Sequence, residues 1–295
     1  MCEKLKPKLA ISQCLVGDNV RYDGRTKPHD FVIDHLSLKF DPTVICPEVE
    51  IGMTVPRKPI QLIIKNNSVH SVEVDDSLID YTEPLRNHAS KMREKIADVS
   101  GYVFKARSPS CGVGTTPVVD AGFNASGVFA EAVLNQHSVL PIIDEAVLDD
   151  HNLRDQFLEN VFCYVAFLMN TKRVDAREKF IHAYGLRWVL RTGMNIKVLE
   201  NVLADDFDAL FFCSMNKLLD SDERKTRVSE AVNNNTVLFN NLGGEFLLVV
   251  ERYLTDSISF FQLTRYLDEL LRKKTTNDYH LEISEDEKYL RTVSV

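Results

Sequence analysis

The chain has 295 residues, of which 44% are apolar and 26% charged, which excludes intrinsic disorder and predicts about two globular domains. Its formal net charge of −8 argues against binding nucleic acid by bulk attraction. There are six cysteines, no apolar core of a signal peptide in the first residues, and no apolar run longer than Val161 to Met169. We therefore expect a soluble cytoplasmic protein with reduced thiols and no membrane contact.

Residues 1–150 predict an α/β domain with a mainly parallel sheet, because short β-rich runs end in turn residues and alternate with longer polar segments. A helix is predicted over 82–99, where apolar residues recur every three or four positions on one face. The strands are expected at 9–12, 43–45, 61–64, 102–105 and 139–142.

After residue 150 the strand signals fade and amphipathic helical patterns dominate. We expect a connecting helix over 151–170, capped by Asp149, Asp150 or Asn152, and a mostly α-helical C-terminal domain over 171–295. The chain is thus predicted to be an α/β domain followed by a helical one.

The cysteines fall into two groups by their surroundings. Cys163 and Cys213 lie in apolar segments and are predicted to be packed as small apolar residues. Cys14, Cys46 and Cys111 each follow a predicted strand and precede a polar or Gly/Pro turn. Because an open parallel sheet binds ligands beyond the carboxyl ends of its strands, these three thiols could meet in one crevice.

Spacing alone leaves the purpose of such a crevice open. The chain has no CxxC pair, which excludes the zinc-ribbon, thioredoxin-like and bacterial ferredoxin patterns. It has no HExxH and no GxSxG motif. Without a P-loop or a GxGxxG motif, we expect no nucleotide cofactor. From the spacing, ordinary turn cysteines and a metal site both remain open.

Three motifs carry a family resemblance: CLVGDNVRYDG from Cys14, CPEVEIGMTVPRKP from Cys46, and KARSPSCGVG from Lys105. In this order they resemble the motifs of the thiouracil desulfidase (TudS) family. The chain departs from the commonest form of that family at Val20, where a cysteine often stands. The remainder of the chain more loosely resembles the helical YbgA-type domain that is fused to a TudS domain in some bacterial proteins.

The resemblance implies a [4Fe-4S] cluster held by Cys14, Cys46 and Cys111, with the fourth iron open to the sulfur of a substrate. The family reaction converts a thiocarbonyl base into the oxo base and sulfide. Water must then attack the ring carbon, which requires a general base. Glu48 and Ser108 match the catalytic Glu and Ser proposed for the family. We therefore expect Glu48 to be the base and Ser108 to orient water or substrate.

Four charged residues of the motifs are secondary candidates for substrate binding, and each could instead form an ion pair that shapes its loop. They are Arg21, Asp23, Arg57 and Lys105.

A basic segment, 171–197, carries seven Lys or Arg residues against two acidic ones. Cations interleaved with aromatic rings are typical of RNA-binding surfaces, whereas the alternative is an amphipathic helix with its aromatic face in the core. His182, in the same segment, is interpreted as a core or surface residue rather than a ligand. The candidates for RNA binding are Arg177, Lys179, Tyr184, Arg187, Trp188 and Arg191.

The sequence thus predicts an iron-sulfur desulfidase that acts on 4-thiouridine in tRNA, or on free 4-thiouracil or its nucleoside. Two alternatives remain. One is a non-catalytic iron-sulfur or zinc protein that binds RNA or senses redox state. The other is a zinc hydrolase or deaminase, although the deaminase signature is missing from the chain.

Overall fold

The computed structural model describes residues 6–170, 176–236, 238–239 and 244–274. For some helical residues, among them Arg177, Lys179 and His182, it describes the backbone alone. The chain forms two compact units, Met1–Arg154 and Asp155–Val295. No helix in the described part combines the length and the apolar character that a membrane span requires.

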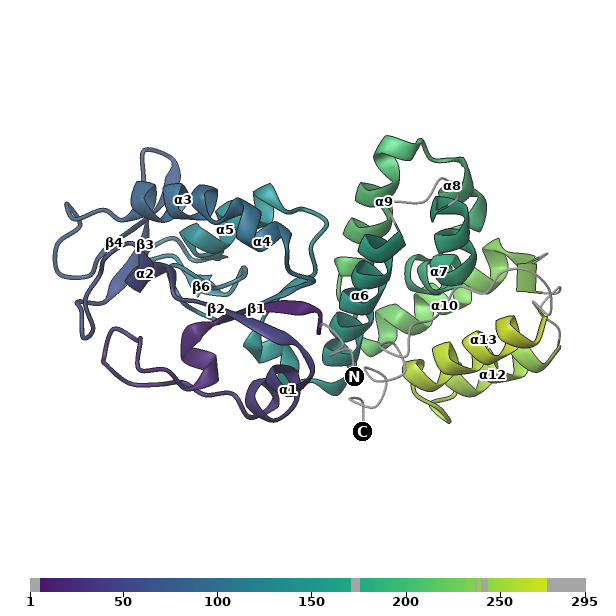
Figure 1. Cartoon of the computed structure of the whole chain (residues 1–295). Coiled ribbons are helices and arrows are strands. Elements are labelled where there is room, and N and C mark those ends of the chain that lie inside the picture. Colours follow the sequence, from purple (N-terminus) through teal and green to yellow (C-terminus); the bar gives the residue numbers. More distant parts are fainter. Residues whose placement is uncertain (1–5, 171–175, 237, 240–243, 275–295) are drawn as a thin grey trace. The chain divides into compact units, whose positions relative to one another are not determined.

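A four-stranded parallel sheet forms the centre of the first unit, in the order β2-β1-β5-β8. Three consecutive residues of β1, Leu9, Ala10 and Ile11, are fully buried, so the sheet is covered on both faces. Helices cover both faces: α3, α4 and α5 lie on one, and the segment that includes α1 lies on the other (Figure 1). The predicted parallel α/β domain is therefore confirmed. The strands are β1 (Lys8–Ser12), β2 (Asp41–Ile45), β5 (Tyr102–Phe104) and β8 (Ile142–Asp144).

Two antiparallel hairpins lie outside this sheet. The predicted strand at 61–64 is part of one of them rather than of the parallel sheet. Asn66 and Asn67 both have positive φ, of 51° and 59°, which suits the tight turn of such a hairpin. The hairpin strands are β3 (Ile60–Lys65) with β4 (Ser68–Glu73), and β6 (Thr116–Pro117) with β7 (Asn124–Ala125).

The helices of the first unit are short. The helix predicted over 82–99 is broken at Met92, which joins two helices instead of continuing one. They are α1 (Ser37–Lys39), α2 (Pro47–Glu50), α3 (Thr82–Lys91), α4 (Arg93–Ala97) and α5 (Val128–Gln136), with η1 (Gln13–Val16), η2 (Val32–Leu36) and η3 (Glu145–Asp149) of other helical types.

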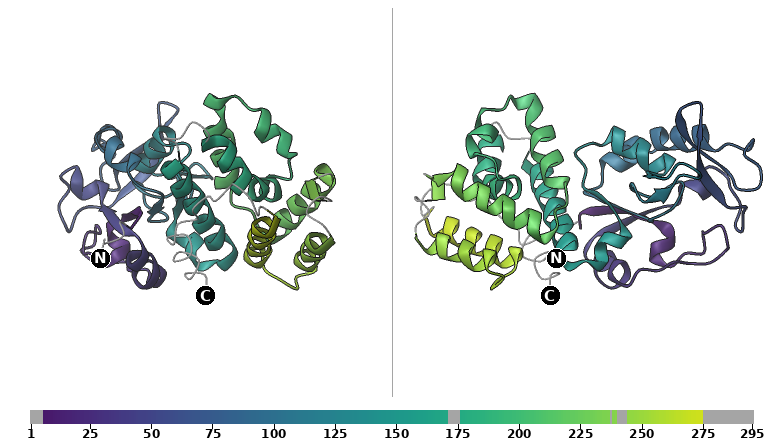
Figure 2. Two further views of the ribbon diagram at one scale, coloured as in Figure 1. Left: turned by 45° about the vertical axis from the view of Figure 1, so that its right-hand side comes forward. Right: turned by 180° about the vertical axis from the view of Figure 1, so that it is seen from behind.

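The second unit is helical in its described part, as predicted (Figure 2). The expected connecting helix is α6, whose first turn is capped by Asp150: its Oδ1 accepts hydrogen bonds from the backbone N–H groups of Asn152 and Leu153. Helix α7 contacts α8, α9 and α10. The helices are α6 (His151–Asn170), α7 (Ala176–Thr192), α8 (Ile196–Asn201), α9 (Ala204–Asn216), α10 (Ser221–Asn234), α12 (Gly244–Leu254) and α13 (Phe260–Lys274).

Candidate active site

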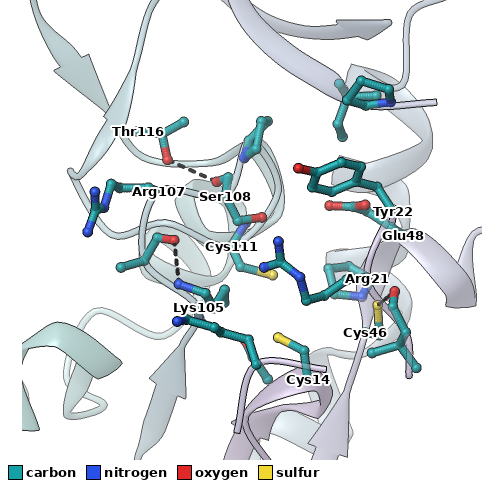
Figure 3. A pocket seen from close by; sticks show the side chains of 18 of the residues that line it. Cys14, Arg21, Tyr22, Cys46, Glu48, Lys105, Arg107, Ser108, Cys111 and Thr116 are labelled. Atoms are coloured by element: carbon teal, nitrogen blue, oxygen red, sulfur yellow. Dashed lines mark hydrogen bonds between the residues drawn. The ribbon is translucent and has the colours of Figure 1, made fainter. Parts of the chain in front are cut away.

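Three cysteines follow three neighbouring strands of the parallel sheet. Cys14 lies in η1 just after β1, Cys46 directly follows β2, and Cys111 lies in the loop after β5. Because β2, β1 and β5 are adjacent and parallel, their carboxyl ends meet at one edge of the sheet. All three thiols line one cavity of about 620 Å³ (Figure 3). The crevice predicted from the strand ends is therefore present.

The three thiols are buried and lie close enough to influence one another. Burial, followed by the neighbouring Cys46, raises the pKa of Cys14 to about 12, while Lys105 and Arg21 act in the opposite direction. Burial also raises the pKa of Cys46 and, well above its usual range, that of Cys111. A bound metal would favour the thiolates, because a coordinating thiol is deprotonated.

This donor set fits an iron-sulfur cluster. Thiolates are the usual protein ligands of iron-sulfur clusters. Within the described ranges, no group of three His, Cys, Asp or Glu side chains is arranged to hold a single metal ion. The described lining of the cavity contains three cysteines, each between 6% and 9% exposed. Three thiols of this kind suit a cluster that keeps one iron without a protein ligand.

Glu48 lies in the same cavity, on α2, and its carboxylate is held at both oxygens. Its Oε2 accepts a hydrogen bond of 2.7 Å from Arg57 Nε and lies 2.5 Å from Arg57 Nη2. Its Oε1 accepts a hydrogen bond of 2.8 Å from the hydroxyl of Ser110, which is fully buried. The carboxylate therefore has a fixed orientation, and Oε1 has room for one more donor.

Ser108 also lines the cavity, at the start of the loop that carries Cys111. Its Oγ accepts hydrogen bonds from the backbone N–H groups of Ser110 and Cys111, at 3.3 and 3.1 Å. Its carbonyl oxygen accepts one from Thr116 Oγ1, which Figure 3 shows as a dashed line. The hydroxyl thus stabilises the cysteine loop as an acceptor, and its own hydrogen remains to be donated.

A family model, 2-thiouracil desulfurase, matches residues 9–145, a range that contains all of these residues. We refer to this matched range, residues 9–145, as the desulfurase domain. One similar solved structure is described as a [4Fe-4S]-dependent thiouracil desulfidase, TudS. It is 28% identical, covers 49% of this chain and 94% of its own, and has a TM-score of 0.40. No curated protein matches the chain.

Of the four secondary candidates in the desulfurase domain, Arg57 and Lys105 are engaged in buried ion pairs. Arg57 pairs with Glu48, and Lys105 pairs with Glu145, which directly follows β8. Lys105 also donates a hydrogen bond to the carbonyl of Ala106. Both side chains line the cavity, and their contacts hold neighbouring loops together.

Arg21 and Asp23 form a weaker and more exposed ion pair in the same domain. Arg21 Nε lies 3.3 Å from Asp23 Oδ1, and the two side chains are 25% and 28% exposed. The same Asp23 oxygen accepts a hydrogen bond from the backbone N–H of Arg25. Arg21 lines the cavity, whereas Asp23 is outside its lining. Asp23 therefore shapes the loop rather than facing the thiols.

Outside the desulfurase domain, the predicted RNA-binding face of α7 is wrong for the four residues whose side chains are described. Tyr184, Arg187, Trp188 and Arg191 are between 0% and 8% exposed. Because α7 is packed against three other helices, its aromatic face and two of its arginines lie in the core. Arg177, Lys179 and His182 have side chains that lie outside the described atoms.

The two buried arginines of α7 have partners within the second unit. Arg187 Nη1 and Arg191 Nη1 lie 3.8 and 4.0 Å from the carboxylate oxygens of Glu159. Arg191 Nη2 donates a hydrogen bond of 2.9 Å to the carbonyl of Met215. Burial lowers the pKa of Arg191 to about 10 against the opposing effect of Glu159, and the nearby Arg224 acts in the same direction as burial. These contacts are those of a buried ionic cluster.

Sequence reasoning missed several residues that build the site. Ser110 and Glu145 hold Glu48 and Lys105. Gly127 is needed because a Cβ there would lie 2.6 Å from the backbone nitrogen of Cys111. Ser110 lies directly before Cys111 in the SPSCG pattern, so the sequence could have indicated that it belongs to the site. Glu145 and Gly127 become neighbours of the site only through strand and helix pairing. One further correction concerns Cys213, which is exposed rather than packed.

Proposed function

We propose that the desulfurase domain removes sulfur from a thiolated pyrimidine, with a [4Fe-4S] cluster held by Cys14, Cys46 and Cys111. The observation that best supports this proposal is the meeting of three buried thiols and a held carboxylate in one cavity. The family match over residues 9–145 supports the same chemistry. When bound, the cluster supplies an iron without a protein ligand, a soft site suited to sulfur.

In this proposal Glu48 accepts a proton from the water that attacks the ring carbon. Arg57 and Ser110 fix the carboxylate, and Oε1 retains the capacity to accept from that water. Ser108 donates its remaining hydroxyl hydrogen to water or substrate. Overall, the C=S group and water give C=O and hydrogen sulfide. The oxygen of the product comes from water, and no external electron donor is needed.

We further propose that the substrate is 4-thiouridine within tRNA, with 4-thiouridine and 4-thiouracil as smaller substrates of the same cavity. Support for the larger substrate is the second, helical unit joined to the desulfurase domain. The buried side chains of α7 do not support it. Docking of tRNA to the helical unit therefore requires surface groups other than Tyr184, Arg187, Trp188 and Arg191.

The test is sulfide release by anaerobically reconstituted full-length protein, given tRNA that contains 4-thiouridine, free 4-thiouridine and free 4-thiouracil in parallel. Release mainly from tRNA supports both proposals. Release only from the small substrates keeps the desulfidase and overturns the tRNA substrate. Cys213→Ser, which changes an exposed cysteine outside the cavity, is the control and should behave as the wild type.

No release from any substrate by protein that carries its cluster would overturn the desulfidase. In that case, binding of tRNA that depends on the metal would favour a non-catalytic iron-sulfur or zinc protein. One zinc per chain without acid-labile sulfide would favour a zinc hydrolase or deaminase instead.

A further inference from the structure

Three arginines, Arg21, Arg57 and Arg107, line the same cavity, and Figure 3 shows the Arg107 side chain directed away from the three labelled cysteines. Arg21 and Arg57 differ in what their donors contact. The donors of Arg57 are largely engaged by the protein. Its Nε and Nη2 bind Glu48, and its Nη1 donates to the carbonyl oxygens of Val20 and Thr54, at 2.9 and 3.4 Å. The side chain is 6% exposed. A guanidinium has five N–H groups, and four contacts with protein acceptors engage those of Arg57, so it has at most one left to offer a ligand.

Arg21 has donors to spare. Its Nε contacts Asp23 at 3.3 Å, while in the described part of the chain its Nη1 and Nη2 have no hydrogen-bond partner. Figure 3 shows the side chain reaching in among the three labelled cysteines. It acts on Cys14 as a nearby positive charge. The two nitrogens that lack partners therefore lie where a ligand of the thiol cavity would have to sit.

Beside Arg21, the ring of Tyr22 offers an apolar face. Tyr22 is 44% exposed and lines the cavity, and the Arg21 guanidinium carbon lies 5.4 Å from the centre of its ring. The backbone of this segment is fixed, because the carbonyl of Tyr22 accepts a hydrogen bond of 2.9 Å from the backbone N–H of Arg57. A flat heterocycle could rest on this ring while its edge meets the Arg21 donors.

We infer that Arg21 determines specificity by donating hydrogen bonds to the carbonyl oxygen that a thiopyrimidine keeps beside its thiocarbonyl group, with the ring of the substrate against Tyr22. This inference rests on the proposed function. In 4-thiouracil that acceptor is the oxygen on C2. A substrate without it would leave a cationic donor unpaired inside the cavity, which costs roughly 10- to 100-fold in kcat/KM.

The test changes Arg21 in the protein and the C2 oxygen in the substrate, and asks whether the effect of one depends on the presence of the other. Sulfide release is measured for 4-thiouracil and for pyrimidine-4(3H)-thione, which has the same thiocarbonyl and N3–H but no C2 oxygen. The wild type should prefer 4-thiouracil. In Arg21→Gln that preference should fall by about 10-fold or more. Intrinsic reactivity of each substrate cancels, because the same two substrates are given to both proteins.

Two further variants separate recognition from charge. Arg21→Lys keeps the positive charge but loses the planar pair of donors, so its preference should also fall. Arg25→Gln removes an exposed arginine of the same segment that does not line the cavity, and its preference should equal that of the wild type. An unchanged preference in Arg21→Gln, or a full preference in Arg21→Lys, would overturn the inference.

A binding measurement decides the question without turnover. Calorimetry on the reconstituted protein compares uracil with 4(3H)-pyrimidinone, which lacks the C2 oxygen. Wild-type protein should bind uracil more tightly by about 10-fold or more, and Arg21→Gln should bind the two about equally. Equal affinities in the wild type would overturn the role of Arg21. Absence of sulfide release together with this binding difference would overturn the proposed function alone.

Discussion

Two clusters of cationic side chains, one at the thiol cavity and one on α7, carry similar residues and lie in opposite surroundings. Arg21, Arg57 and Lys105 line a cavity. Arg187 and Arg191 are 8% and 2% exposed inside the helical unit. The first group lies in loops beyond strand ends, where the backbone leaves one side open, whereas α7 is surrounded by other helices. Residue type predicts a charge, and the position in the fold decides whether a ligand can reach it.

The same contrast exists within the cavity itself. Arg57 and Lys105 are fixed by carboxylates from neighbouring loops, whereas Arg21 keeps two nitrogens without a partner in the described residues. The ion pairs of Arg57 and Lys105 hold neighbouring loops in place. Of these three side chains, Arg21 keeps the most donors for a substrate.

The largest expected effect on stability concerns α7. Trp188→Ala removes a ring that is 0% exposed, and it should lower the free energy of unfolding by about 3–5 kcal/mol. Leu248→Ala, at a side chain that is 60% exposed, is the control and should cost about 0.5 kcal/mol or less. Urea unfolding measures both. Loss of tRNA binding by Trp188→Ala with unchanged stability would restore the surface interpretation of α7.

At the cavity, a smaller effect is expected, and it concerns the activation free energy of the reaction rather than the free energy of unfolding. Glu48→Gln keeps the shape of the side chain but removes its ability to accept a proton, so kcat for sulfide release should fall about 100-fold. Ser110→Ala, which removes one of the hydrogen bonds that orient Glu48, should lower kcat about 10-fold. Both variants should retain iron. Full turnover by Glu48→Gln with an intact cluster would show that Glu48 is not the base.

The smallest effect is expected at Asp80, which lies between β4 and α3 and contacts His70 of β4. Burial acts to raise the pKa of Asp80, but hydrogen bonds from Thr82 and His70 outweigh it and lower the pKa to about 2. An unfolded aspartate has a pKa of about 3.9. The carboxylate therefore stabilises the fold above about pH 4, and this contribution disappears as the pH falls through about 2.

Asp80→Asn should accordingly lower the free energy of unfolding by about 1 kcal/mol at pH 7. The deficit should narrow as the pH falls from 5 towards 2. Urea unfolding of both proteins at several pH values measures this. A deficit that is the same at every pH would show that the charge of Asp80 contributes nothing.

Much of the cavity could be predicted because its three cysteines follow the ends of strands. Cys14, Cys46 and Cys111 each follow a short apolar run, and parallel strands bring such ends to one edge. Glu48 and Ser108 could then be predicted because they lie close to Cys46 and Cys111 within the motifs. Site residues that are near the cysteines in the chain could therefore be predicted from the sequence.

Features that depend on tertiary pairing were not accessible in this way. Glu145 reaches Lys105 because β8 pairs with β5. Strand β4 went unrecognised because its pairing depends on the Asn66–Asn67 turn. On α7, the helical spacing of the aromatic residues fits a face buried in the core and an exposed face that stacks on RNA bases equally well. Only the contacts of that helix with its neighbours distinguish the two.

The most direct test of the central claim is metal analysis of the anaerobically reconstituted full chain and of its Cys→Ser variants. The account predicts about four irons and four acid-labile sulfides per chain. It further predicts that Cys14→Ser, Cys46→Ser and Cys111→Ser each lose this content, whereas Cys213→Ser keeps it. Iron content that is unaffected by the three cavity substitutions, or one zinc without acid-labile sulfide, would contradict it.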